Sequence, residues 1–288
     1  MTPLRQRFID MLEARNLSAS TVESYVGAVA KISLFHKKSP LLFTEDEVRG
    51  FLLHELKNEK LEPRTVELHR CALVTFYRAV APEITIMNKC ARIKTAHKLP
   101  VVLSREEVER LLEGIKNLKH RALVTLLYSS GLRLRECVNL KTKHIDHDRM
   151  TVHVENGKGK KDRYVVLSHR ALELLKEYQR TYLTPDWLFP SPFQNSPISA
   201  RTVEQVVSGA AKKAGIQKHV HPHTLRHSFA THLLEAGVSL QIIQQFLGHE
   251  NLKTTAIYAH ISSAMVSAVV SPFDMAMRST PEAANVQR

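Results

Sequence analysis

The chain has 288 residues, of which 41 are Lys or Arg and 28 are Asp or Glu, so its formal net charge at pH 7 is +13. This length can bury a sizeable core, and we expect two domains. No apolar leader and no run of about eighteen apolar residues occurs, which argues against a membrane protein and predicts a cytoplasmic one.

The excess of positive charge is spread along the chain and is not gathered in one tail. Such a distribution suits a protein that surrounds a polyanion, because phosphate contacts gain affinity through counterion release. The alternative is a protein whose basic charge serves no ligand. The cysteines Cys71, Cys90 and Cys137 lie far apart without metal-ligand spacing, so we expect reduced thiols.

The N-terminal part, residues 1–90, is predicted to be an all-helical domain. Thr44 and Glu47 form a capping box ahead of an apolar run, and Pro63 suits the first turn of a further amphipathic helix. Residues 91–100 lack apolar periodicity, carry several basic side chains and end in proline. We interpret them as a basic interdomain linker.

Residues 101–280 are predicted to form a second, mostly helical domain, followed by a tail at 281–288. Ser104 and Glu107 make another capping box, and an apolar helix over 120–130 should stop at Gly131.

A small antiparallel sheet interrupts these helices. Three short β-prone runs, at 144–147, 150–155 and 163–167, are joined by turn residues. Helices then resume at about 169–182, 200–214, 224–236, 240–247 and 262–276. The predicted fold class is therefore mainly α with a small antiparallel β-sheet, in two domains.

His223 and Arg226 are three residues apart, so on a helix they share one face near the helix start. Backbone N–H groups and the helix dipole favour an anion there, and the pair predicts a phosphate seat. The alternatives are a charged surface turn, or a metal site that also uses His227. We expect no metal, because no HExxH glutamate accompanies the histidines.

Two further cations belong to candidate positions upstream. Arg133 follows a glycine stop, and Glu136 is placed to hold its guanidinium by a forked hydrogen bond; a purely structural ion pair is the alternative. Lys158 stands between two glycines, which let a ligand approach closely, whereas Lys160 and Lys161 favour a solvated basic hairpin.

Tyr258, taken alone, is typical of a core tyrosine. A phenol of pKa about 10 is ionised to roughly one part in a thousand at pH 7, so forming the phenolate costs about 4 kcal/mol. Arg133, Arg226, His223 and His249 can lower that cost and stabilise charge on a phosphate. A departing 5′ oxygen also needs an acid, and Lys158 is the group left for it.

At these residues the chain resembles the tyrosine recombinase (phage integrase) family, in outline its Xer-like and integron-type bacterial members. The matching segments are GLRLRE at 131–136, GKGKKDRYVVL at 157–167, HPHTLRHSFATHLLEAG at 221–237, LGH at 247–249 and TTAIYAH at 254–260.

The resemblance implies a two-domain DNA clamp, with a helical core-binding (SAM-like) domain and a recombinase catalytic domain. It implies catalytic roles for Arg133, Lys158, His223, Arg226, His249 and Tyr258, with Tyr258 as nucleophile and Glu136 in support.

The family reaction runs through a 3′-phosphotyrosyl intermediate and a Holliday junction, without ATP, metal or other cofactor. The implied partners are double-stranded DNA with inverted half-sites and a homotetramer, or related recombinase subunits. The apolar stretch 261–273 would dock on a neighbouring subunit; packing on its own domain is the alternative.

Basic residues outside this set are candidate DNA contacts, namely Arg64, Arg70, Arg92, Lys94, Lys98, Lys160 and Lys161. Two other functions share parts of the pattern. One is a type IB topoisomerase-like nicking and resealing activity without partner exchange. The other is a DNA-binding protein whose active site is vestigial.

Overall fold

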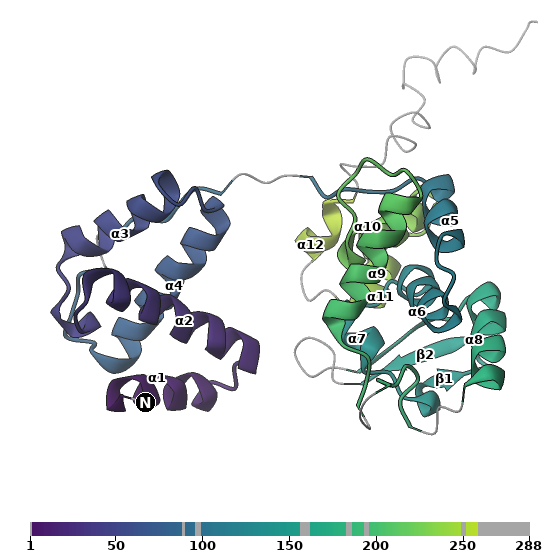
Figure 1. The fold of residues 1–288 in the computed structure, drawn as a ribbon, viewed down its shortest axis with the longest axis horizontal. Coiled ribbons are helices and arrows are strands. Elements are labelled where there is room, and N and C mark those ends of the chain that lie inside the picture. The colour runs from purple at the N-terminus through teal and green to yellow at the C-terminus, as the bar shows by residue number, and fades with distance from the viewer. Residues whose placement is uncertain are drawn as a thin grey trace, which may run out of the picture. The chain divides into compact units, whose positions relative to one another are not determined.

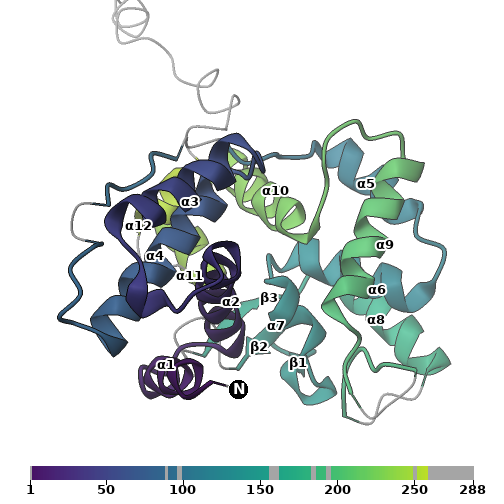
Figure 2. The same cartoon turned by 60° about the vertical axis from the view of Figure 1, so that its left-hand side comes forward.

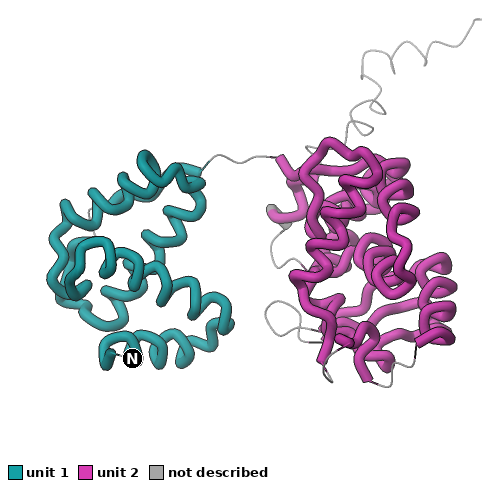
Figure 3. Tube along the Cα trace, viewed as in Figure 1, with its two compact units in different colours: residues 1–98 teal, residues 99–288 magenta. Residues whose placement is uncertain are grey.

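The computed structural model describes residues 2–87, 90–95, 99–155, 162–182, 186–192, 196–248 and 252–258. The chain forms two compact units, unit 1 at residues 1–98 and unit 2 at residues 99–288 (Figure 3).

Unit 1 is helical throughout its described elements, which are α1 (Pro3–Ala14), α2 (Ala19–His36), the 3₁₀ turn η1 (Pro40–Leu42), α3 (Glu45–Lys57) and α4 (Pro63–Val80). Its core is built from one apolar stripe of each helix. Phe8 of α1 packs edge-to-face on Phe76 of α4, with ring centroids 5.2 Å apart, and Ile32 and Phe51 are fully buried beside them.

The predicted helix starts in both units are confirmed. Thr44 and Glu47 exchange both hydrogen bonds of a capping box, at 3.3 and 2.8 Å, and Pro63 occupies the first turn of α4. Ser104 and Glu107 do the same, at 3.2 and 2.7 Å. These caps satisfy backbone N–H groups that have no partner inside a helix.

Unit 2 is mainly helical, and Figure 1 labels most of its elements. They are α5 (Arg105–Glu113), α6 (Leu118–Ser129), α7 (Leu134–Val138), the 3₁₀ turn η2 (Thr142–His144), β1 (Ile145–Asp146), β2 (Thr151–Val154), β3 (Arg163–Val166), α8 (His169–Thr181), α9 (Ala200–Lys213), α10 (Pro222–Glu235), α11 (Leu240–Leu247) and α12 (Leu252–Ala256). None of the helices described in either unit has the length and apolar character needed to cross a bilayer.

The three strands form the predicted antiparallel sheet in the order β1, β2, β3 (Figure 2). Val152 pairs with Val165, and Val154 pairs with Arg163. Val152, Val154 and Val165 are buried in the core of unit 2, while Tyr164 on the other face is exposed. This alternation follows from the two-residue period of a strand.

Three helices were not predicted individually, and two of them are short. Helix α1 was covered only by the general expectation of helices, and α7 and α12 have five residues each. Five residues hold too few apolar positions for a helical period to appear. The predicted helix at 262–276 and the predicted hairpin tip at 156–161 lie outside the described residues.

The start of the linker is fixed to α4 by an ion pair. Arg70 donates two hydrogen bonds of 2.8 Å to Glu67 and one of 3.4 Å to the carbonyl of Cys90. Glu67 also accepts from the backbone N–H of Ile93 at 2.9 Å. The structure therefore gives Arg70 an anchoring role, because its side chain is 9% exposed and its donors face protein oxygens; its prediction as a DNA contact stays a prediction.

The chain is fixed again where it enters unit 2. The backbone N–H of Leu103 donates to Ser228 Oγ at 2.9 Å, and its carbonyl lies 3.0 Å from His232 Nε2. Ser228 and His232 are four residues apart on α10, so one helix face holds this point of the chain.

Gly131 connects α6 to Arg133 in a backbone conformation that a side chain would disturb. Its φ is +60°, and a Cβ atom there would lie 2.3 Å from the ring of Phe229. Its carbonyl accepts a hydrogen bond of 2.7 Å from Arg226. The predicted helix stop at Gly131 is confirmed. Because Gly131 has no side chain, α6 and α10 can approach each other closely.

We therefore expect Gly131→Ala to destabilise unit 2 by about 3 kcal/mol or more, from left-handed strain of about 1 kcal/mol and overpacking of about 2 kcal/mol. The matched control is Gly215→Ala, which also has positive φ (+68°) but no atom within 4 Å of the added Cβ. It should lose only about 1 kcal/mol. Denaturant unfolding of both variants measures the difference; equal losses would contradict the role of Phe229.

Candidate active site

Helix α10 places two of the predicted residues, His223 and Arg226, in its first turns. Pro222 occupies the first helical position, and the backbone N–H of His221 donates to Thr224 Oγ1 at 3.3 Å. His223 reaches solvent at this helix start. Its pKa is lowered, first by the protein that surrounds much of the ring and then by the charge of Arg226.

Arg226 is 3% exposed and projects into unit 2. Its Nη1 donates to the carbonyl of Gly131 at 2.7 Å, and its Nη2 donates to the carbonyl of Leu247. Burial lowers its pKa to about 9, and the neighbouring charge of Arg133 acts in the same direction. The guanidinium therefore remains protonated at pH 7, held by backbone oxygens from two other segments.

Arg133 is the N-cap residue of α7 and is brought beside Arg226 by the tight turn at Gly131. Its Nη1 donates to Glu136 Oε1 at 2.8 Å, and its Nη2 donates to the carbonyl of Gly248 at 3.1 Å. Its backbone N–H donates to the second carboxylate oxygen of Glu136 at 2.8 Å. The side chain is 20% exposed, so part of the guanidinium faces outward.

The forked ion pair of Glu136 involves a different arginine from the one predicted. Arg163 of β3 donates to both oxygens of Glu136, at 2.9 and 2.7 Å, whereas Arg133 reaches only one of them with its side chain. Two parallel N–H···O bonds of this kind are the strongest form of arginine–carboxylate pair. Although burial by itself raises the pKa of Glu136, Arg163 and Arg133 together hold it at about 2.

Three arginines converge on the C-terminal end of α11. Consecutive carbonyls at this end, those of Phe246, Leu247 and Gly248, accept hydrogen bonds from Arg163, Arg226 and Arg133 respectively. The last carbonyls of a helix have no partner within the helix and carry the negative end of its dipole. Gly248, with φ of +58°, ends α11 as predicted.

Tyr258 follows α12 and is 1% exposed. Its ring packs with Phe229, Leu234 and Ile243, while its hydroxyl lies 3.1 Å from His227 Nδ1. Burial raises the pKa of Tyr258, and the charges of Arg226 and Arg133 oppose that rise. The hydroxyl therefore lies among polar and cationic groups at the edge of an apolar cluster.

The structure thus brings four predicted residues into one region of unit 2: Arg133, Glu136, Arg226 and Tyr258, with His223 on the same helix as Arg226. Lys158 and His249 lie outside the described residues, as do Lys98, Lys160 and Lys161. Among the remaining predicted DNA contacts, Arg64, Arg92 and Lys94 are exposed.

Two residues at the site were missed from the sequence, Arg163 and His227. Arg163 stands in a β-prone run next to three lysines, where one more basic residue gives no signal of its own. For His227, the sequence pattern indicates only the alternative of a metal ligand. In the part of the chain that the structure describes, no three His, Cys, Asp or Glu side chains gather as metal ligands would.

Comparisons with known proteins agree with this geometry. Residues 101–265 match the phage integrase family, and residues 4–84 match the N-terminal SAM-like domain of phage integrases. The y4qK protein of Sinorhizobium fredii is 39% identical over 98% of this chain and 92% of its own. Tyrosine recombinase XerC of Bacillus subtilis is 32% identical over 90% of this chain and 92% of its own.

A solved structure shows the same arrangement of elements. The XerH site-specific recombinase, bound to a palindromic difH substrate after cleavage, matches with a TM-score of 0.71 at 25% identity, over 95% of this chain and 86% of that one. The chain therefore belongs to the phage integrase family and is a tyrosine recombinase, an enzyme that breaks and rejoins DNA strands.

Proposed function

We propose that this protein performs site-specific recombination with Tyr258 as the nucleophile and with Arg133, Arg226, His223 and His249 around the scissile phosphate. The observation that carries this assignment is the meeting of Arg133 and Arg226 at the end of α11, close enough to Tyr258 for both charges to oppose the rise in its pKa. Two guanidiniums that share one region can hold the non-bridging oxygens of a phosphodiester.

Tyr258 attacks the phosphorus and forms a 3′-phosphotyrosyl bond, and the 5′ oxygen leaves with a proton from Lys158. The free 5′ hydroxyl of a partner strand then attacks the covalent bond, which gives a Holliday junction. Because the phosphotyrosyl bond conserves the energy of the cleaved bond, no ATP is consumed. Tyr258 is 1% exposed in the structure without DNA.

The proposed substrate is double-stranded DNA with inverted half-sites, and the protein is proposed to act in the cytoplasm. XerH, with the same fold, is bound to its DNA substrate in the matched structure. The exposed Arg64, Arg92 and Lys94 support DNA contact from unit 1 and the linker. We propose further contacts by Lys98, Lys160 and Lys161. We propose that residues 1–90 form a DNA-binding domain and residues 101–280 the catalytic domain. Residues 91–100 would link the two, and residues 281–288 would form a tail.

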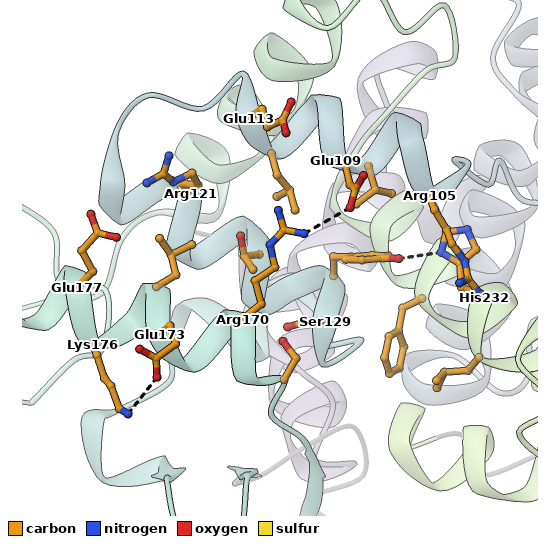
Figure 4. A pocket seen from close by; sticks show the side chains of 18 of the residues that line it. Arg105, Glu109, Glu113, Arg121, Ser129, Arg170, Glu173, Lys176, Glu177 and His232 are labelled. Atoms are coloured by element: carbon orange, nitrogen blue, oxygen red, sulfur yellow. Dashed lines mark hydrogen bonds and ion pairs between the residues drawn. The ribbon is translucent and has the colours of Figure 1, made fainter.

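We further propose that a homotetramer, or related subunits, assemble through residues 261–273. A groove of about 860 Å³ in unit 2 lies among α5, α6, α8 and α10 (Figure 4). Its lining includes the apolar Val108, Leu112 and Leu233, next to an ion pair between Arg170 and Glu109 at 3.4 Å. An apolar helix from a neighbouring copy, flanked by polar residues, has the chemistry to fill it.

Tyr258→Phe should retain DNA binding and abolish covalent adducts, because the ring stays and only the attacking oxygen is lost. Nicked suicide substrates, analysed on denaturing gels, measure the adduct, and a mobility shift measures binding. The matched control is Tyr182→Phe, a 44% exposed tyrosine at the end of α8, which should form adducts normally. Adducts that persist in Tyr258→Phe would refute the nucleophile.

Lys158→Ala should slow cleavage of ordinary DNA by roughly 100-fold or more, as expected for loss of a general acid. A substrate with a 5′-thio leaving group should restore the rate, because a thiolate leaves without a proton. Cleavage rates on the two substrates are compared for the variant and the unchanged protein. An equal loss on both substrates would remove Lys158 from this role.

Glu136→Gln should release Arg133 and Arg163 together. Removing one partner of a buried ion pair costs about 3 kcal/mol, and misplacing Arg133 should slow cleavage roughly 10- to 100-fold. The pH dependence of unfolding gives a second measurement. Because the folded pKa of Glu136, about 2, lies below its ordinary value, its stabilisation is present above about pH 4.3 and is lost as the pH falls toward 2.

Glu136→Gln should therefore lose less stability than the unchanged protein as the pH falls from about 4.3 toward 2. The matched control is Glu47→Gln, which breaks an ion pair to Lys38 in unit 1, at 2.6 and 2.8 Å. It should leave the cleavage rate unchanged. If Glu136→Gln cleaves as fast as the control, Glu136 does not position Arg133.

A further inference from the structure

The hydroxyl of Tyr258 is hydrogen-bonded to His227, a residue that has no role in the mechanism proposed above. Tyr258 Oη lies 3.1 Å from His227 Nδ1, and the ring centroids are 5.7 Å apart at an interplanar angle of 51°. A buried phenolic O–H requires an acceptor, and within the described residues the atom in contact with it is this nitrogen. The phenol therefore donates to Nδ1.

His227 is neutral in this state. Burial, and after it the charges of His223, Arg226 and His221, lower its pKa to about 4. A neutral imidazole whose Nδ1 accepts a hydrogen bond carries its proton on Nε2, which leaves a lone pair on Nδ1 directed at the tyrosine hydroxyl.

We propose that His227 is a catalytic residue that takes the proton from Tyr258 during cleavage and returns it during rejoining. This inference rests on the proposed function, in which Tyr258 is the nucleophile. It assigns the proton acceptor to the residue after Arg226, one helical turn beyond His223.

Other groups at the site are less suited to this step. Glu136 is bound by Arg163 and Arg133, and its pKa of about 2 makes it a weak base. His223 lies at the exposed start of α10, where its ring neighbours His221 at a centroid distance of 6.2 Å. His227 is neutral, and its Nδ1 lone pair already accepts the proton of the reacting oxygen in a hydrogen bond.

Binding of the DNA phosphate would make His227 a stronger base. Without DNA the proton stays on Tyr258, since its pKa is raised while that of His227 is about 4. A phosphodiester seated on Arg226 and Arg133 brings a negative charge that offsets the cations facing His227 and favours its protonated form. Proton transfer is thereby coupled to phosphate binding, and the nucleophile stays inert elsewhere.

The step balances as follows. The Oη–H bond of Tyr258 breaks, and the proton passes to His227 Nδ1. The electron pair left on Oη forms the bond to phosphorus, the P–O5′ bond breaks, and O5′ receives a proton from Lys158. In rejoining, the P–O5′ bond forms while the proton of the attacking 5′ hydroxyl returns to Lys158, and the protonated His227 gives its proton back to Oη as the phosphotyrosyl bond breaks.

The test combines His227→Asn with a more acidic nucleophile. The amide oxygen of Asn can accept the hydrogen bond near the Nδ1 position but takes up no proton at neutral pH. We expect about a 100-fold slower formation of covalent adducts on suicide substrates, with DNA affinity retained. Placing 3,5-difluorotyrosine at position 258 should recover at least about tenfold of that loss, because a more acidic phenol depends less on a base.

The control is His169→Asn, at an exposed position of α8, which should cleave normally. Thermal melting checks folding, and His227→Gln replaces the Asn variant if that variant unfolds. Normal adduct formation by the folded variant, or a loss that difluorotyrosine does not reduce, would overturn the inference while leaving Tyr258 as nucleophile. If the unchanged protein forms no adduct, the proposed function fails and this inference fails with it.

Discussion

The site depends on the hydrogen bonds that three arginines donate to the carbonyls at the last turn of α11. Guanidiniums that lie close together repel, and burial adds to their cost. Here three of them donate to three successive carbonyls at the negative end of one helix, and Glu136 neutralises two of the three. The three guanidiniums are thus held together in one place without a ligand. Preorganised charge of this kind is what stabilises a phosphoryl-transfer transition state.

Two opposite faces of helix α10 make different contacts. Ser228 and His232 hold Leu103, where the linker enters unit 2, while His223, Arg226 and His227 face the site. One helix therefore holds both the start of unit 2 and the groups that we propose to meet the phosphate. The same helix contacts Tyr258 through His227, so the proposed nucleophile is held by the helix that also carries Arg226.

Much of the local structure was predictable. Capping boxes at Thr44 and Ser104, and glycine stops at Gly131 and Gly248, are interactions within a few residues, and the structure confirms them. The prediction failed where a partner was remote. The polar neighbours of Arg163 are Glu136 and the carbonyl of Phe246, 27 and 83 residues away, so no local pattern distinguishes this arginine from a solvated one.

The sequence by itself determined which chemical groups are available, a phenol, guanidiniums and imidazoles in motifs of recognisable spacing, and which short segments become helices and strands. It did so because caps, turns and apolar periods act over a few residues. Only the tertiary structure decided which arginine forks onto Glu136, which imidazole touches Tyr258, and that the phenol is buried at rest. Those choices depend on contacts between elements 27 to 115 residues apart, and their geometry is fixed by how helices and strands pack.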